Sequence, residues 1–447
     1  MKKLLITNAR LVNEGAITEA DVLIDGERIE KIASSIKAAD DTRVLDAEGR
    51  HLIPGMIDDQ VHFREPGLTH KGDIATESAA AVAGGITSYM EMPNVDPPTT
   101  TIAALEEKYD RAAGRSSANF AFYLGATNDN ISQIRALATG SACGIKVFMG
   151  ASTGNLLVDD PAALELIFRD APVTVVTHCE DSPMIWEAEA AAREKYGEDV
   201  PMSEHPRIRS AEACYKSSSY AVDMARRHGT RLHVLHLTTA LEMELFSTAP
   251  RGEKHVTAEV CVHHLWFDES DYERLGALIK CNPAVKRRED RDALRQALAD
   301  GRIDVVATDH APHTAEEKAS SYFGAPAGLP LVQHALPSMF EHVHEGRYSL
   351  EFVVDRTSHA VADIFGVENR GYVREGYYAD LAIVDMDDPW TVSKDNLLYK
   401  CGWSPFEGVT FRSRIRTTLV NGRVVWDAGR IVGEPAGQRM SFGAPVR

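Results

Sequence analysis

The sequence predicts an α/β fold, in which a (β/α)8 barrel of the TIM type is joined to a small β-sandwich domain built from both termini. Eight short apolar runs, separated by helix-length amphipathic stretches, lie between about residues 56 and 360 of the 447-residue chain. Such alternation is typical of a parallel sheet covered by helices. Both ends of the chain instead carry short alternating segments with tight-turn signals. The predicted domains are therefore 1–55 with 365–447 for the sandwich, and 56–364 for the barrel.

Hairpins are predicted near both termini. Asp25-Gly26 and Asn421-Gly422 each lie between two short apolar segments, and a further strand is predicted over 379–386. Asp-Gly and Asn-Gly favour the two-residue turns that join antiparallel strands. We therefore expect both ends of the chain to contribute strands to one β module.

The eight apolar runs are the predicted barrel strands. They cover residues 55–61, 86–92, 119–124, 144–149, 173–177, 232–235, 256–260 and 304–308. In such a barrel the chemistry lies at the carboxyl ends of the strands. The side chains that follow each run are therefore the candidate site residues.

Composition limits the possible partners. The formal charge is −18, from 48 Lys and Arg against 66 Asp and Glu, and this charge repels nucleic acid and anionic membranes. The apolar run near the N-terminus is too short to be expected as a signal peptide, and no apolar stretch has the length that spans a membrane. The six cysteines are scattered without a C-x-x-C pair, so no disulfide framework or cysteine zinc site is indicated. We expect a cytoplasmic protein that acts on a small molecule.

Polar residues stand at the ends of six of the predicted strands. They are His62, Asn94, Lys146, His178, His236 and Asp309. One such residue alone is usually structural, but three imidazoles and a carboxylate from four strands can converge on the barrel mouth. His and Asp together suit zinc or a similar divalent ion.

Lys146 lies within the strongly apolar run Gly-Ile-Lys-Val-Phe-Met-Gly, residues 144–150. Burial there penalises the charged form of the amine. A neutral lysine could form a Schiff base, or take up carbon dioxide as a carbamate able to bridge two metal ions. Alternatively, the side chain extends to solvent at the strand end.

Other histidines receive no role. His342 and His344 fall in a helix-like stretch and are expected at the surface. His263 and His264 are adjacent just after the seventh run, where neighbouring side chains point in opposite directions, so at most one faces the mouth. The Gly-, Ala- and Pro-rich loop 321–330 is either a substrate-contacting lid or a plain surface connection.

Four segments resemble the dihydroorotases of the amidohydrolase superfamily, and the similarity runs from end to end. Residues 307–318, Ala-Thr-Asp-His-Ala-Pro-His-Thr-Ala-Glu-Glu-Lys, fit the family signature at every position, and residues 58–71 fit at all but one. Met-Pro-Asn at 92–94 and Lys-Cys-Asn-Pro at 280–283 resemble substrate-binding segments of the family. The superfamily fold, a barrel with a β-sandwich from both termini, agrees with the independent prediction above.

The resemblance implies two zinc ions bridged by a carbamylated Lys146 and a hydroxide. One ion would be held by His178 and His236, and the other by His62 and Asp309, with Asp309 also serving as the catalytic acid and base. The implied substrate residues are Arg64, Asn94 and His313 for a carboxylate, and Asn282, Ala327 and Gly328 for the ring. An arginine together with neutral hydrogen-bond donors suits a carboxylate. It would attract an anionic substrate locally, although the net charge of −18 repels anions.

Gln60 departs from the family pattern, because a histidine usually stands at this position. Residues i and i+2 of a strand share a face, so the side chain of Gln60 should still point at the metal. An amide oxygen is a weaker zinc ligand than imidazole. We expect a tight ion at Lys146, His178 and His236 and a weaker second ion at His62 and Asp309.

The resemblance implies reversible conversion of N-carbamoyl-L-aspartate to (S)-dihydroorotate and water, a step of de novo pyrimidine (UMP) biosynthesis. Another cyclic amidase, an allantoinase or dihydropyrimidinase, would share the metal residues, but Arg64 would have no carboxylate partner in an uncharged ring. Gln60 motivates a third interpretation, a non-catalytic scaffold, although the other ligands are all present. A homodimer is the default expectation from base rates.

Overall fold

The computed structural model describes residues 3–150 and 156–443 and contains the predicted barrel. Each of the eight predicted runs contains or overlaps a barrel strand. These strands are β6 (Met56–Val61), β7 (Ile86–Glu91), β8 (Asn119–Phe122), β10 (Ile145–Phe148), β11 (Val175–His178), β12 (Leu232–Val234), β13 (Val256–Cys261) and β14 (Val305–Ala307). The fold prediction is confirmed.

The strands pair in parallel and in sequence order, as expected for βαβ units. One sheet runs β6-β7-β8 and the other β9-β10-β11-β12-β13-β14, where β9 is the short strand Leu124–Gly125. The ring closes where the His62 amide donates to the carbonyl oxygen of His310 over 2.7 Å. This contact brings the end of β6 beside the chain that follows β14.

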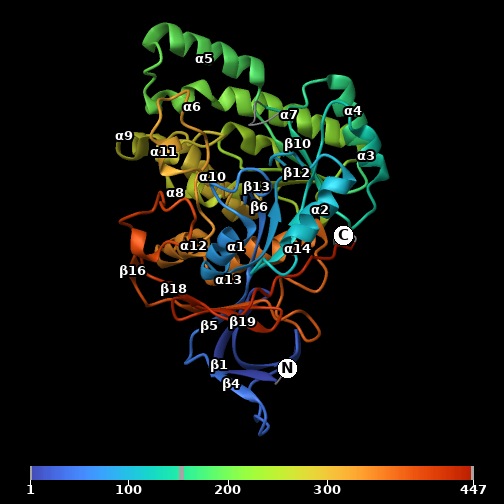
Figure 1. Ribbon diagram of the computed structural model, residues 1–447, viewed down its shortest axis with the longest axis vertical. Coiled ribbons are helices and arrows are strands. Elements are labelled where there is room, and N and C mark those ends of the chain that lie inside the picture. The colour runs from blue at the N-terminus through green and yellow to red at the C-terminus, as the bar shows by residue number, and fades with distance from the viewer. Residues whose placement is uncertain (1–2, 151–155, 444–447) are drawn as a thin grey trace.

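Helices surround the barrel (Figure 1). They are α1 (Ile74–Ala83), α2 (Ile102–Ala112), α3 (Ile131–Ala136), α4 (Pro161–Asp170), α5 (Ser182–Tyr196), α6 (His205–Ile208), α7 (Ala211–His228), α8 (Val262–Trp266), α9 (Tyr272–Leu275), α10 (Arg288–Asp300), α11 (Ala315–Lys318), α12 (Ala335–His344), α13 (Leu350–Val354) and α14 (Ala360–Phe365). Local signals define their ends. The longest, α7, begins after Ser210, whose hydroxyl accepts from the Ala213 amide, and ends at Gly229 with φ 69°, a left-handed C-cap that favours glycine.

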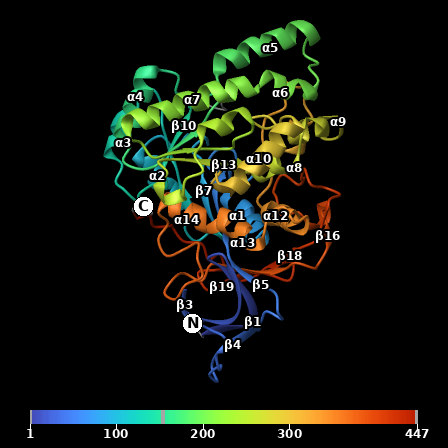
Figure 2. The same ribbon diagram turned by 180° about the vertical axis from the view of Figure 1, so that it is seen from behind.

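Both termini build one nine-stranded sheet below the barrel, as predicted (Figures 1 and 2). Its N-terminal strands are β1 (Leu4–Asn13), β2 (Ala16–Asp25), β3 (Arg28–Ala33), β4 (Arg43–Asp46) and β5 (His51–Pro54). Its C-terminal strands are β15 (Leu381–Asp385), β18 (Arg414–Val420), β19 (Arg423–Asp427) and β20 (Arg430–Ile431). The two sets join where β5 and β15 pair antiparallel. The predicted domain boundaries at 55/56 and 364/365 stay a prediction.

The predicted hairpins are present in this sheet. Asp25-Gly26 connects β2 to β3, and Asn421-Gly422 connects β18 to β19, with φ 51° at Asn421 and 72° at Gly422. A separate two-stranded ribbon pairs β16 (Trp390–Thr391) with β17 (Thr410–Phe411). Since β5 leads directly into β6, the amino ends of the barrel strands face the sheet. The carboxyl ends therefore open on the far side, towards α5 and α6 (Figure 2).

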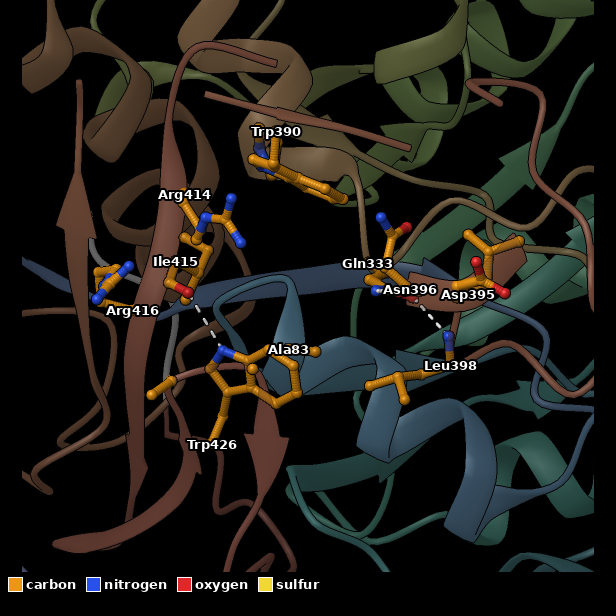
Figure 3. Close-up of a pocket in the computed structure, with 14 residues that line it drawn as sticks. Ala83, Gln333, Trp390, Asp395, Asn396, Leu398, Arg414, Ile415, Arg416 and Trp426 are labelled. Carbon is orange, nitrogen blue, oxygen red and sulfur yellow. Dashed lines mark hydrogen bonds between the residues drawn. The ribbon is translucent and has the colours of Figure 1, made fainter. Parts of the chain in front are cut away.

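A cavity of about 300 Å³ lies between the barrel and the C-terminal strands (Figure 3). It is lined by Ala83 of α1, Trp390, Ile415 of β18 and Trp426 of β19, and the Trp426 indole donates to the Ile415 carbonyl over 3.2 Å. None of the residues predicted for the site lines this cavity. In the described residues, no helix combines the length and apolar character needed to cross a membrane.

Candidate metal centre and substrate pocket

A second cavity, of about 90 Å³, lies at the barrel mouth and gathers most of the predicted residues. It is lined by Gln60, His62, Arg64, Asn94, Lys146, Phe148, His178, His236, Asn282, Asp309, Ala311, Ala327 and Gly328. Among the predicted site residues only His313 is missing from this lining. The structure thus brings the predicted set together, and the role of each residue stays a prediction.

An irregular β6 shapes one wall of this cavity. Asp58 pairs with Tyr89, and Val61 pairs with Glu91. The segment of β6 between these pairs is therefore one residue longer than the segment of β7 that it faces, which is a β-bulge. Neighbouring side chains of a regular strand point to opposite faces, but a bulge re-aims them. As a result, Gln60 lines the mouth while the adjacent Asp59 reaches His233 across the barrel interior, 3.2 Å away.

His178 and His236 face each other as two ligands of one ion would. His178 Nδ1 lies 3.0 Å from His236 Nε2, and burial lowers the pKa of both rings. On the far side of its ring, His178 Nε2 contacts a Glu180 oxygen at 2.9 Å. A carboxylate there holds the proton on Nε2 and leaves Nδ1 free to bind a metal.

Glu180 is a candidate positioning residue that the sequence analysis did not single out. Burial acts to raise its pKa, but the charge of Arg209 and the hydrogen bond to His178 outweigh burial, so the pKa is lowered. Glu180 therefore stays ionised and orients the ring. Its position two residues after a strand-end histidine was the available signal.

On the opposite wall, Asp309 joins His62 and Gln60. Asp309 Oδ1 lies 2.9 Å from His62 Nε2 and accepts from Gln60 Nε2 over 3.0 Å. Burial acts to raise the pKa of Asp309, but the hydrogen bond to His62 and nearby positive charges lower it overall. The Gln60 amide oxygen is buried without a hydrogen-bond partner in the described residues. An unpartnered oxygen at this place fits a cation ligand.

Lys146 is fully enclosed rather than extended to solvent. Its side chain is 1% exposed, and its amine lies 4.6 Å from the centre of the Phe148 ring. Burial lowers the pKa of Lys146 to about 8. An appreciable fraction is therefore neutral near pH 7 to 8, which is the form that reacts with carbon dioxide.

Arg64 brings an unpaired positive charge into the cavity. Its guanidinium is 4% exposed, and its partners, the Pro312 carbonyl and His313 Nε2, lie 3.1 Å away. Burial lowers its pKa to about 10, so it stays charged, whereas burial keeps His313 neutral by lowering the histidine's pKa. Arg64 forms no ion pair with any described residue. A buried cation of this kind requires an anion.

The remaining predicted residues form the cavity's rim. The Asn282 side-chain oxygen is buried and has no hydrogen-bond partner among the described residues, so it is available to accept from a ligand N–H. Gly328 has φ 144°, and a Cβ there would lie 2.4 Å from the Ala311 carbonyl oxygen. Only glycine fits this close approach.

Two histidine predictions were wrong in part. His342 is 3% exposed rather than at the surface, because the rings of Trp266 and Tyr348 pack around it. His263 and His264 do not point apart, because the chain turns into α8 there and their ring centres lie 3.9 Å apart. Neither of that pair lines the cavity.

Two further clusters have side chains close enough to hold a metal ion. One comprises Cys261, His263 and His264, and the other Asp59, His233 and Glu259; the ligand atoms of each lie within 4.8 Å of one another. All six residues are buried. Both clusters are separate from the predicted ligand set.

Comparison with known proteins adds independent findings. The amidohydrolase family pattern matches residues 51–425. A dihydroorotase of Halobacterium salinarum is 36% identical over 439 residues, which cover 94% of this chain and 97% of that protein. A dihydroorotase of Methanosarcina acetivorans is 34% identical over 447 residues, covering 97% and 94% respectively. The solved L-hydantoinase (dihydropyrimidinase) of Arthrobacter aurescens superposes with a TM-score of 0.93 at 29% identity, covering 99% of this chain and 100% of that chain.

Proposed function

This chain belongs to the amidohydrolase family, and we propose that its barrel-mouth cavity interconverts N-carbamoyl-L-aspartate and (S)-dihydroorotate, as the names of its dihydroorotase relatives suggest. Ring closure joins the carbamoyl nitrogen to one carboxyl group, releases water and consumes a proton; hydrolysis reverses it. This is the reaction used in de novo pyrimidine biosynthesis. A homodimer also remains our expectation.

Arg64 carries the choice of substrate. Both dihydroorotate and N-carbamoyl-aspartate keep a carboxylate that does not react, whereas a simple hydantoin ring has none. A buried guanidinium without an ion pair in the described part of the chain stabilises such a carboxylate through charge-assisted hydrogen bonds. This observation supports dihydroorotate over the hydantoins on which the solved structural relative acts by its name.

The donor set fits two zinc ions. Two neutral imidazoles 3.0 Å apart, a buried lysine and an unpartnered amide oxygen are suitable ligands. We assign the tighter ion to His178, His236 and a carbamate on Lys146, and the weaker one to His62, Asp309 and Gln60. When bound, such ions lower the pKa of water and polarise a carbonyl.

The chain's own residues then position the substrate and move the proton. Arg64 holds the carboxylate, with Asn94 and His313 beside it, and Asn282 accepts from a ring N–H. Asp309, kept ionised by its surroundings, takes the proton of the attacking water and gives it to the ring nitrogen that leaves. The backbone of Ala327 and Gly328 closes the rim over the ring.

The test is turnover of dihydroorotate by the purified protein with and without zinc, using hydantoin and allantoin as controls. We expect the protein to turn over dihydroorotate but neither hydantoin nor allantoin. Arg64→Gln should lower kcat/KM for dihydroorotate about 30-fold or more, as expected when one partner of a buried charge pair is truncated, while Arg64→Lys retains part of it. Hydantoin turnover exceeding that of dihydroorotate would refute the assignment.

A further inference from the structure

A second group of potential ligands lies inside the barrel. Asp59 of β6, His233 of β12 and Glu259 of β13 are each 0% exposed. His233 Nε2 lies 3.2 Å from Asp59 Oδ2 and 3.8 Å from Glu259 Oε2. The three side chains come from three strands and meet at one point across the barrel.

The atoms that face this point have no partners other than one another. Asp59 Oδ1 and Oδ2, His233 Nε2 and Glu259 Oε2 are all buried, and none makes a hydrogen bond of good geometry within the described residues, although His233 Nε2 lies within ion-pair distance of both carboxylates. Buried polar groups are nearly always satisfied by a partner. Four such atoms converging on one point form a set of potential ligands that either a proton on His233 or a cation can hold together.

The environment of His233 determines where one proton of its ring lies. His233 Nδ1 lies 2.8 Å from Thr257 Oγ1, and that hydroxyl donates its own hydrogen to the Leu232 carbonyl over 3.3 Å. The hydroxyl must therefore accept from the imidazole, which places a proton on Nδ1. Burial acts to lower the pKa of His233, but hydrogen bonds to Asp59 and Glu259 raise it to about 9, so without an ion a proton on Nε2 holds the two carboxylates together. A metal ion would replace that proton and bind the Nε2 lone pair. This tautomer is the one that a hydrogen-bonded metal ligand adopts.

We propose that Asp59, His233 and Glu259 bind one divalent first-row metal ion, Zn²⁺ or Mn²⁺, at a structural site inside the barrel. The charge of the ion balances the two carboxylates around a neutral imidazole. Ligands about 2.1 Å from one ion lie roughly 3.0–3.5 Å apart, close to the two observed separations. One nitrogen and two carboxylates suit zinc or manganese better than a sulfur-preferring ion.

The site has a structural role towards His236. The other oxygen of Glu259, Oε1, accepts from the His236 backbone amide over 3.0 Å. His236 has φ 37°, a left-handed conformation that costs energy in a non-glycine residue. An ion that fixes Glu259 therefore helps to hold the His236 backbone, without contacting the substrate.

The decisive experiment is anomalous scattering from crystals of the intact protein produced in medium supplemented with Mn²⁺ or Zn²⁺. We expect a peak about 2.1 Å from the three ligand atoms at the absorption edge of the supplied metal. Since this readout is a position rather than an activity, it does not depend on the proposed reaction. The absence of any peak between these three residues, in crystals with metal at Lys146, His178 and His236, would overturn the proposal.

Metal content provides a second measurement. Glu259→Gln and Asp59→Asn should each contain about one ion per chain less than the unaltered protein. The matched control is Glu242→Gln, which changes a buried carboxylate bonded to Ser218 and Thr239 and should leave metal content unchanged. Equal metal content in all four proteins would show an imidazolium–carboxylate cluster without an ion. If the variants fail to fold, the anomalous map of the unaltered protein still decides.

Discussion

Residues at strand ends could be predicted individually because the barrel fixes where they go. Eight periodic runs determine eight carboxyl ends, so His62, Lys146, His178, His236 and Asp309 were found without knowledge of their contacts. Residues inside the barrel could not be found in this way. Asp59 and His233 lie within strands and are brought together only by the bulge in β6 and the closure of the ring. Their proximity has no local signal in the sequence.

The side chain at position 60 should affect how tightly the second metal ion is bound. Gln60→His would supply an imidazole in place of the unpartnered amide oxygen, and imidazole is the stronger zinc ligand. We expect the affinity for the second ion to rise on the order of tenfold or more, a change of the size that supporting residues of metal sites produce. Zinc content after dialysis against graded chelator measures this affinity.

The comparison needs a control at the same position. Gln60→Ala removes the oxygen and should hold the second ion no better than the unaltered protein does. The ion assigned to His178 and His236 should be retained equally in all three proteins. Identical retention of the second ion with Gln and His at position 60 would contradict a ligand role for this residue.

At the scale of elements, the prediction succeeded where the signal is local. Strands and hairpins depend on short periodic runs and on dipeptides such as Asn421-Gly422, and both are present. It failed where the environment is built by distant segments. His342 has a helical neighbourhood typical of a surface, yet rings from α8 and from the loop before α13 bury it. Burial of this kind depends on packing that the local sequence does not encode.

The ammonium group of Lys318 holds two loop segments of the cavity rim together. Lys318 Nζ donates to the carbonyl oxygens of Lys280, Pro326 and Gly328 at 3.0, 2.9 and 3.0 Å. The three acceptors match the three hydrogens of the ammonium form of Lys318. Lys318 thereby ties the segment that carries Asn282 to the segment that carries Gly328, and both line the cavity.

Lys318→Met should therefore loosen the cavity rim without touching the metal residues. Three buried carbonyls lose their donor, at about 1–3 kcal/mol for each group left unsatisfied, unless the loop rearranges. We expect KM for dihydroorotate to rise about tenfold while kcat falls less, with zinc content unchanged. Lys195→Met, at an exposed position near the end of α5, is the control and should match the unaltered protein. A fall in kcat with constant KM would contradict a positioning role.

At the scale of the whole molecule, one buried carboxylate connects the barrel to the terminal sheet. Asp380, just before β15, accepts from the Asn119 side chain of β8 over 3.1 Å and from the Asn421 amide over 2.8 Å, and it forms an ion pair with Arg370. Arg370 is 2% exposed and Asp380 4%. Barrel, hairpin and connecting loop thus meet at a single group. The sequence predicted the two modules but contained no signal for this junction.

Asp380→Asn tests whether the junction stabilises both modules together. Removing one charge leaves the Arg370 guanidinium buried without its counter-ion, and breaking a buried pair in this way costs about 3–5 kcal/mol. We expect the free energy of unfolding in urea to fall by that amount, with barrel and sheet still unfolding in one transition. Asp387→Asn, at an exposed position two residues after β15, should change it by less than about 0.5 kcal/mol. If Asp380→Asn instead produced two separate transitions, the carboxylate would be needed for cooperative unfolding of the two modules as well as for their stability. A change in the free energy of unfolding as small as that of the control would show that the junction contributes to neither.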